Sequence, residues 1–413
     1  VKYLLNLSNF TIDIKTKNSQ ILLEGRSLGI KEIQTNVALK SFINDQFSID
    51  HLQIKTKEIK VEDMIALGRI FQNSSQLFIL NTVIKDGFIK ANVSFNFDEK
   101  GRIKKDYKIE GFVKKAKLNI LNQFKLKNLN FNFNIQQDIY SLKKIEMKLN
   151  DVKVTSPFIE IQEKKNSFFV NGKFSNDKNN FDIGELRPIF ANLTKNIDIK
   201  KVEFSSTNNF SFNVSKKLKF NDLKIKSTID LKQLIFHKKN LKVNSFLPSF
   251  AEEVKLTEHT IIIDYDKNKI DIKGDGNFLL GEKLDNLSYQ IINSKEVIKF
   301  SSKVNLKNNS LLIDFLNYDK KEGLNSTILL KGNLKKNNQL KFDLINFKEK
   351  NNHILIKGLN LSKNFKIIDI EAFSINYRNN KKILNSLNLN KDNSNFIIEG
   401  ESFDASKIID TIM

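Results

Sequence analysis

The chain has 413 residues, of which 40% are hydrophobic, and its 68 basic and 47 acidic residues give a net charge of +21. A chain this rich in apolar residues can bury a large core, so it is not a disordered protein despite its charge. Cysteine is absent, which excludes a disulfide framework and any metal site or nucleophile built on cysteine.

The positive charge is almost entirely lysine, because only five of the 68 basic residues are arginine. Proteins that bind nucleic acid favour arginine for bidentate contacts with phosphate and guanine. The lysines are also spread evenly along the chain, as expected where they coat the solvated face of strands and protect sheet edges. We therefore expect no nucleic-acid partner, while attraction to an acidic membrane surface stays open.

Alternation of apolar and polar residues is the main signal from residue 1 to about residue 400, and it predicts strands with one apolar and one solvated face. In chain order the clearest strands are 93–97, 129–135, 210–214, 270–272 and 354–357. Short polar segments between such runs predict turns at 98–101, 176–180, 266–268 and 335–338.

Short helices are expected at 62–71, 188–196, 248–254 and 404–413. The first places Met64, Leu67 and Phe71 on one face, and the second and third each begin with a proline, which suits the first helical position. Pro157 is expected to break an edge strand. No linker rich in Gly, Ser or Pro divides the chain, so the sequence predicts one continuous β architecture over 1–413.

One-sided strands must hide their apolar face, and the expected helices are too few to cover it. Stacked β-sandwiches are one solution, and a long sheet curled around its own apolar face is another. The curled sheet leaves a trough that acyl chains would fill, at about 0.8 kcal/mol per buried methylene. Alternation alone does not separate the two. In the trough the lining residues would be Val93, Phe95, Phe97, Phe131, Phe133, Ile135, Phe210, Phe212, Val214, Ile270, Ile272, Ile354 and Ile356.

No group of residues nominates a reaction, a metal or a cofactor. The four histidines are isolated in the sequence, at His51, His237, His259 and His353. The acidic residues around the expected hairpin at 266–268 lack the Gly and the final Glu of a calcium loop. Phosphate-binding loops and nucleophile elbows are also missing from the sequence. We expect no enzyme, metal or cofactor.

The segment Gly400–Ile409 (GESFDASKII) resembles the G-x-S-F-D-A-x-P-L-L segment of bacterial AsmA-like proteins, in their YhdP-like branch, with Lys407 in place of the usual proline. The stretch 64–97 is also similar to that branch: a short helix is followed by 77–82, by 84–91 and by the strand ending at Phe97. Family members commonly carry Trp where Leu77 or Phe78 stands.

The resemblance implies an elongated, curled antiparallel sheet, or β-taco, with a hydrophobic groove. AsmA-like proteins, among them TamB, are periplasmic proteins held in the inner membrane by an N-terminal helix. They are implicated in moving phospholipid between the inner and outer membranes and resemble eukaryotic bridge-like lipid transfer proteins. The chain would then be an internal periplasmic segment whose groove holds phospholipid acyl chains, with the two membranes and the anchor reached by parts outside it. The oligomeric state stays open, and a monomer is favoured.

Two other functions stay open on the sequence. A structural or adhesive array of β-sandwiches at a cell surface predicts closed cores and no lipid cargo. An enzyme or binding domain on a β scaffold predicts a polar pocket where ionisable groups converge.

Overall fold

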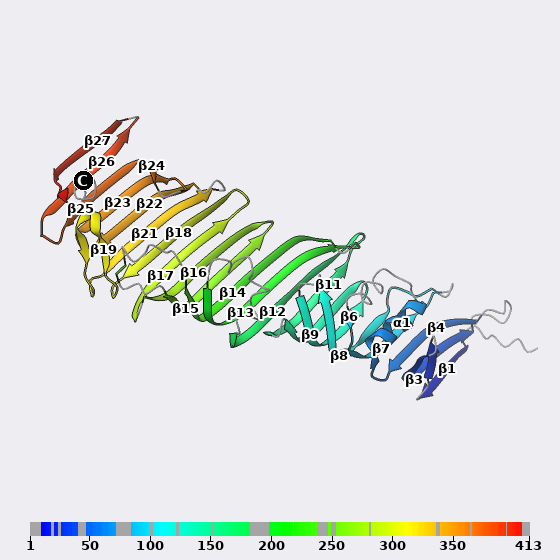
Figure 1. Cartoon of the computed structure of the whole chain (residues 1–413). Helices are drawn as coiled ribbons and strands as arrows, with labels where there is room; N and C mark the ends of the chain where they lie inside the picture. The colour runs from blue at the N-terminus through cyan, green and yellow to red at the C-terminus, as the bar shows by residue number, and fades with distance from the viewer. Residues whose placement is uncertain are drawn as a thin grey trace, which may run out of the picture. The chain divides into compact units, whose positions relative to one another are not determined.

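The structure is a computed structural model of the chain. It describes residues 10–17, 20–23, 26–39, 47–71, 84–98, 102–120, 124–149, 152–181, 198–217, 219–237, 247–248, 253–280, 282–335, 339–363, 366–393 and 395–406. The chain divides into two compact units, which we describe separately (Figure 1). Unit 1 comprises Val1–Asn176 and Asn209–Leu223, and unit 2 comprises Asp177–Asn208 and Lys224–Met413.

Among its described residues, unit 1 contains one helix and a series of strands. They are β1 (Phe10–Lys17), β2 (Gln20–Leu23), β3 (Arg26–Leu39), β4 (Phe47–Thr56), β5 (Ile59–Lys60), α1 (Val61–Phe71), β6 (Ile84–Lys85), β7 (Phe88–Asn96), β8 (Lys108–Ile120), β9 (Phe124–Gln136), β10 (Ile139–Leu149) and β11 (Val152–Glu163). Three further strands contribute residues to both units: β12 (Ser167–Phe181), β13 (Asp198–Ser215) and β14 (Phe220–His237).

The strands of unit 1 pair antiparallel and mostly in chain order. β1 pairs with β3, β3 with β4 and β4 with β7. From β7 to β12 each strand pairs with the next one. The alternation in the sequence therefore becomes a meander whose apolar residues share one face.

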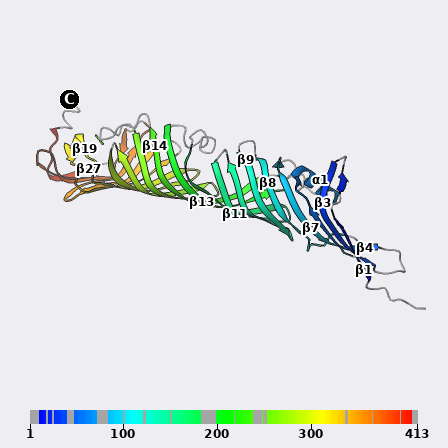
Figure 2. The same ribbon diagram turned by 90° about the horizontal axis from the view of Figure 1, so that it is seen from below.

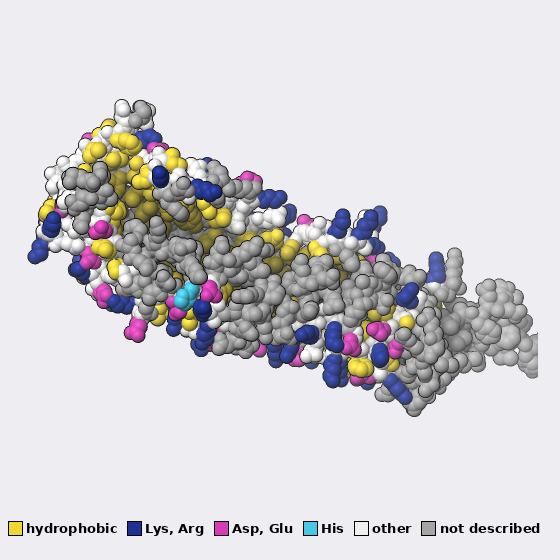
Figure 3. All heavy atoms as spheres, in the orientation of Figure 1, with side chains coloured by type: hydrophobic (Ala, Val, Ile, Leu, Met, Phe, Trp, Pro, Cys, Tyr) yellow, Lys and Arg dark blue, Asp and Glu magenta, His cyan; other side chains and the backbone are white. Residues whose placement is uncertain are grey.

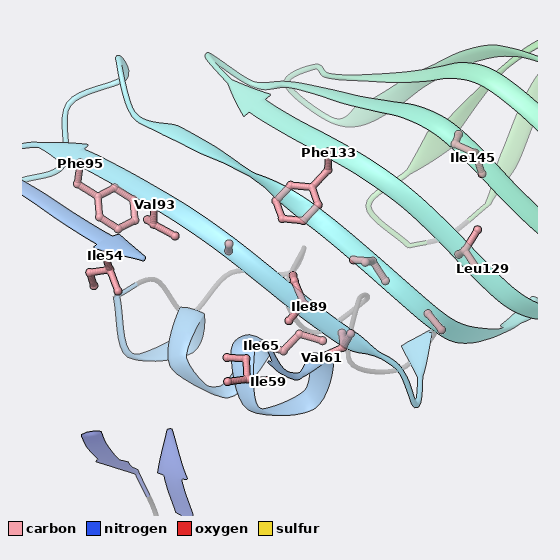
Figure 4. Packing of buried hydrophobic residues seen from close by; sticks show 13 residues of the cluster. Ile54, Ile59, Val61, Ile65, Ile89, Val93, Phe95, Leu129, Phe133 and Ile145 are labelled. Atoms are coloured by element: carbon pink, nitrogen blue, oxygen red, sulfur yellow. The ribbon is translucent and has the colours of Figure 1, made fainter. Parts of the chain in front are cut away.

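Helix α1 covers part of the apolar face of unit 1. Its Val61 and Ile65 are buried in one cluster with residues of β4, β7, β8, β9 and β10, among them Ile54, Val93 and Phe133. Figure 4 shows both side chains of α1 pointing to Ile89 of β7. The helix thus closes the core where the sheet would otherwise leave its apolar face in water.

The strands that lie wholly in unit 2 run from β15 to β27. They are β15 (Glu253–Asp266), β16 (Lys269–Leu280), β17 (Lys283–Asn293), β18 (Val297–Leu306), β19 (Leu311–Ile313), β20 (Tyr318–Lys320), β21 (Ser326–Lys335), β22 (Leu340–Glu349), β23 (Asn352–Leu361), β24 (Ile367–Asp369), β25 (Ala372–Arg378), β26 (Leu384–Asp392) and β27 (Asn395–Ser402). A short 3-10 helix, η1 (Asp314–Leu316), joins β19 to β20.

Antiparallel pairing in unit 2 again follows the chain. It runs β14, β15, β16, β17, β18, β21, β22, β23, β25, β26 and β27. The hairpin of β19 and β20 forms a separate two-stranded sheet. Seen from below in Figure 2, the sheet of unit 2 is curled rather than flat.

These observations confirm the predicted fold class: the protein is mainly β, with an open, curled antiparallel sheet and few helices. The predicted turn at 266–268 is also confirmed. Lys267 and Asn268 there have φ of 46° and 71°, as a tight hairpin requires. Helix 62–71 is confirmed as α1, whereas helix 188–196 lies outside the described residues, as does most of 404–413. A single groove over 1–413 stays a prediction.

Three local predictions are wrong. Residues 176–180 do not form a turn but continue β12, since pairing in a sheet overrides a weak turn preference. The expected helix at 248–254 is not formed where it is described, because β15 already begins at Glu253. Pro157 does not mark an edge strand: it lies in β11, which has neighbours on both sides, at a register shift that spares its missing N–H.

Candidate functional site: an open apolar strip in unit 2

The register of unit 2 arranges its apolar side chains in rows across the sheet. Ile272 of β16 stands opposite Ile291 of β17, which stands opposite Phe300 of β18. Successive rows lie about 7 Å apart along the strands. We call the face that carries these rows the inner face. The inner face is covered to different extents at the two ends of the strands.

At one end of the strands the inner face is buried under a plug, the segment Leu311–Lys320 formed by β19, η1 and β20. Leu311, Leu316 and Tyr318 of the plug share a cluster with Phe347, Ile354, Ile375 and Tyr377 of the sheet. The Tyr377 hydroxyl donates to the Leu316 carbonyl oxygen at 2.6 Å. The plug therefore closes this end of the inner face as α1 does in unit 1.

At the other end, which we call the open side, the apolar rows are only half-buried. The open side is where the turns between β15 and β16, β17 and β18, β21 and β22, and β26 and β27 lie. Figure 3 shows hydrophobic side chains gathered in a hollow of unit 2. We call these rows the open strip, and its residues are Ile261, Ile263, Ile270, Ile272, Ile291, Phe300, Leu330, Leu334, Phe342, Ile345, Ile356, Leu359, Phe373 and Leu389.

Glycines keep the floor of the strip flat. Tyr289 of β17 lies across Gly274 of β16, where an added Cβ would come 2.3 Å from the tyrosine Cζ. Phe300 of β18 lies in the same way across Gly332 of β21, where a Cβ would come 2.7 Å from its Cζ. Because the glycines have no side chain, the rings can lie down on the neighbouring strand.

A few polar side chains interrupt the apolar floor. Tyr289 stands opposite Ser302 of β18, and burial raises the pKa of the tyrosine. One row further toward the plug, the His259 ring lies 6.2 Å from that of Tyr289, between ring centroids. His259 is buried, and its Nε2 donates to the Asn277 carbonyl oxygen at 2.9 Å. Ser302 and Asn293, which lie in the rows of Leu330 and Ile270, place two more polar side chains on this face.

Lysines outnumber carboxylates on the open side. Its described turn residues include seven lysines (Lys267, Lys269, Lys295, Lys335, Lys363, Lys366 and Lys391) against five acids (Asp266, Glu296, Asp369, Glu371 and Asp392). Three of these acids have an ion pair: Lys224 lies 3.0 Å from Asp266, Lys391 lies 2.6 Å from Asp369 and Lys341 lies 3.1 Å from Glu371. The rim of the strip is therefore positive and suited to an anionic group.

The thirteen predicted lining residues fall into different surroundings. Ile270, Ile272 and Ile356 belong to the open strip, whereas Ile354 is buried under the plug. In unit 1, Val93, Phe95 and Phe133 are buried in the core, and Phe97, Phe131 and Ile135 pack against that core.

The remaining three lie on β13 in unit 1. Val214 is buried, whereas Phe210 and Phe212 are half-buried. The rings of Phe210 and Phe212 stack with centroids 5.8 Å apart, and Phe212 lies 5.5 Å from Phe220. Unit 1 thus has an aromatic surface of its own.

Each histidine bonds to a neighbour on its own sheet. His51 lies 2.8 Å from Asn96 Oδ1, His237 lies 3.0 Å from Glu253, and His353 lies 2.8 Å from Asn346 Oδ1. Asp264 and Asp271 stand opposite each other near the hairpin of β15 and β16, and Gln290 Nε2 donates to Asp271 at 2.9 Å. Within the described ranges no group of three or more His, Cys, Asp or Glu side chains is placed to hold a metal ion.

Of the helices that the structure describes, none has both the length and the hydrophobicity needed to cross a membrane.

The sequence did not reveal the plug or most of the strip. The plug sequence, LLIDFLNYDK, has no regular alternation. Strip residues such as Phe342 and Leu330 lie in ordinary alternating strands. Alternation gives the face on which their side chains lie, but their exposure depends on whether another segment covers that face. No family model, curated protein or solved structure matches this chain.

Proposed function

We propose that this chain binds phospholipid through its acyl chains along the open strip and passes it on without covalent chemistry. The observation that carries the proposal is the set of half-exposed apolar rows on the inner face of the unit 2 sheet. Side chains that are almost all aliphatic or aromatic stay half-exposed over strands β15 to β26 instead of closing into a core. An apolar surface of this extent is costly in water unless something apolar covers it.

The chemistry of the strip fits a phospholipid better than a purely apolar ligand. Acyl chains would cover the isoleucine, leucine and phenylalanine rows, at about 0.8 kcal/mol per buried methylene. The lysines of the open side would face the phosphate of a head group that remains in water. The two-sheet core of the adhesive alternative has no counterpart among the described strands of unit 2, where the sheet faces a single hairpin.

The resemblance to AsmA-like proteins supports a place for this activity. It favours the periplasm of a Gram-negative envelope, where phospholipid would move between the inner and outer membranes. It also favours a passive conduit, in which no residue acts as a catalyst.

A charge in the middle of the strip provides the test. Phe300→Glu replaces a half-buried ring of β18 by a carboxylate, which the strip cannot solvate. We expect the amount of phospholipid bound after incubation with vesicles, measured by native mass spectrometry, to fall about tenfold, which corresponds to about 1.4 kcal/mol.

Lys299→Glu is the matched control, because Lys299 is the exposed neighbour of Phe300 on the opposite face of the same strand. It should bind as much phospholipid as the unchanged chain. Equal binding by Phe300→Glu, or no phospholipid on the unchanged chain, would show the proposal to be wrong. Phe133 is a poor place for this test, since it is 8% exposed in the core of unit 1 and a charge there would unfold the unit.

A further inference from the structure

We propose that unit 2 docks on an anionic lipid membrane through an apolar patch at the end of the open strip. The docking patch consists of Ile367 and Ile368 of β24 and Phe396, Ile397 and Ile398 of β27. This inference goes beyond the lipid binding proposed above and does not rest on it, because a chain with an empty strip would carry the same patch.

Exposure sets the docking patch apart from the rest of the described surface. Ile367, Ile398 and Ile368 are 68%, 61% and 59% exposed, and no other large apolar side chain of the described residues is as exposed. Phe396 and Ile397 follow at 48% and 47%. Single apolar side chains on a surface are ordinary, but five this exposed, on two strands that reach the same end of the sheet, mark an interaction surface.

Pairing and one ion pair bring the two halves of the patch together. Ile367 stands opposite Leu361 of β23, and Phe396 stands opposite Lys391 of β26. The Lys391 ammonium reaches Asp369 of β24 at 2.6 Å. Both halves therefore lie at the open side, where the strands end.

The charges around the docking patch fit an anionic membrane. Lys363 and Lys366 come just before β24, and both are exposed and without an ion pair among the described residues. Asp369 is neutralised by Lys391 and Glu371 by Lys341, which leaves Asp392 as the carboxylate of these turns without an ion pair among the described residues. Apolar side chains flanked by lysines are the combination that binds the interface of an acidic bilayer.

The pattern along β27 favours a membrane over a partner strand. All eight residues of β27 are exposed. Its apolar residues, Phe396 to Ile398, lie in the half at the open side, and Glu399 and Glu401 lie in the other half. A partner strand would cover both halves, whereas a membrane interface would take up the apolar side chains of the first half and leave the glutamates in water.

The docking patch continues the open strip. Ile398 stands opposite Leu389, and Ile367 stands opposite Leu361, which is half-buried at the end of its row. An acyl chain that leaves the bilayer at the patch would therefore meet apolar side chains along its way into the strip.

Vesicle flotation tests the inference with the full chain. The probe is phosphatidylcholine vesicles with or without phosphatidylglycerol. The double variant Ile367→Ser, Ile368→Ser should bind vesicles about tenfold more weakly than the unchanged chain. Lys363→Glu with Lys366→Glu should remove the preference for vesicles that contain phosphatidylglycerol. Ile262→Ser is the control, since Ile262 is 44% exposed on the opposite face of β15 in the same unit.

The outcomes separate this inference from the proposed function. Phe300→Glu should still float with vesicles, and the Ile367, Ile368 double variant should still carry phospholipid in native mass spectrometry. Flotation of the double variant equal to that of the unchanged chain overturns the docking patch. Absence of vesicle binding by the unchanged chain overturns it as well. A concentration-dependent dimer that is lost in Ile397→Pro also overturns it, because it would show that the surface pairs with a strand of a second copy.

Discussion

His259 is a buried histidine of unit 2 that lies beside an irregularity in strand β15. Glu258 just before it has a φ of 52°, and this irregularity in β15 accompanies the shift in pairing with β16. The ring lies over Gly276, where a Cβ would come 2.5 Å from it. Because Nε2 donates to a carbonyl oxygen, Nδ1 is the unprotonated nitrogen of a neutral ring.

Burial lowers the pKa of His259, against smaller opposing effects of the Asn277 carbonyl and the Asp275 carboxylate. The unfolded chain therefore binds a proton at His259 more readily than the folded chain does. We expect the free energy of unfolding of unit 2 to be highest above pH 6.5 and to fall as the pH drops below that value. His259→Gln, which cannot be protonated, should flatten this dependence in urea titrations between neutral and mildly acidic pH.

His353 is a second histidine whose titration should contribute to the same pH dependence. Its pKa is also lowered, by burial and by Lys348, but it lies on β23 and bonds to Asn346. The pH dependence left in His259→Gln should decrease again in the double variant with His353→Gln. If His259→Gln has the same pH dependence as the unchanged chain, the neutral buried ring is not what sets the acid sensitivity.

At the residue scale, the sequence predicts the face of a side chain better than its exposure. Alternation placed Ile272 and Ile354 on the apolar face, and the register puts both on the inner face. Yet Ile272 is half-buried in the open strip and Ile354 is buried under the plug. The difference in exposure comes from the plug residues, which are distant in sequence from both isoleucines. No local sequence pattern can therefore predict it.

At the scale of the element, a buried polar network around Asp285 and Lys320 fixes the start and the end of the plug. The Asp285 carboxylate of β17 accepts from the backbone N–H of Lys307, Asn308 and Asn309, at 2.8, 3.0 and 2.9 Å. Lys320, which is fully buried, donates to the carbonyl oxygens of Lys307 and Asn309 at 2.9 and 2.7 Å. Burial lowers the pKa of Lys320, and Asp285 is the strongest of the acids that counter this shift.

Loss of the Asp285 carboxylate should release the plug. Asp285→Ala leaves three backbone donors without their acceptor and removes the negative charge that most favours the charged form of the buried Lys320. Removal of one partner of such a network costs about 3 kcal/mol or more. We expect a lower melting temperature of unit 2 and faster proteolysis at 307–325. Asp392→Ala, at an exposed turn of the same unit, should leave both unchanged. Melting temperatures of Asp285→Ala and the unchanged chain that agree would contradict this role.

Elements with strong local signals could be predicted, and elements that depend on distant partners could not. The turn at 266–268 and helix 62–71 carry their own signals, namely an Asn that tolerates positive φ and an amphipathic spacing. The segment 176–180 resembles a turn in composition, but the sheet draws it into β12. Tyr377 binds the plug at Leu316, and Asp285 binds the residues just before it, Lys307 to Asn309. Neither Tyr377 nor Asp285 is near the plug in the sequence.

At the scale of the whole molecule, each unit has its own buried cluster. The core of unit 1 gathers around α1, and that of unit 2 gathers around the plug. Ile145 and Ile375 are matched members of the two cores, each 2% exposed. Two separate cores allow two separate unfolding transitions.

Truncation of each isoleucine tests whether the units unfold separately. Ile145→Ala and Ile375→Ala should each cost about 2–4 kcal/mol in their own unit. In differential scanning calorimetry we expect two transitions, one lowered by Ile145→Ala and the other by Ile375→Ala. A single transition that both variants lower equally would show that the two units unfold as one.

The glycines beneath Tyr289 and Phe300 have a consequence for motion along the strip. A ring that stood upright would divide the floor into separate pockets, each holding an apolar ligand at one place. A ring that lies on its neighbouring strand adds apolar area without adding a barrier. The energy of a ligand on such a floor changes little from one strand to the next, so the ligand would be held against the sheet and yet remain free to slide.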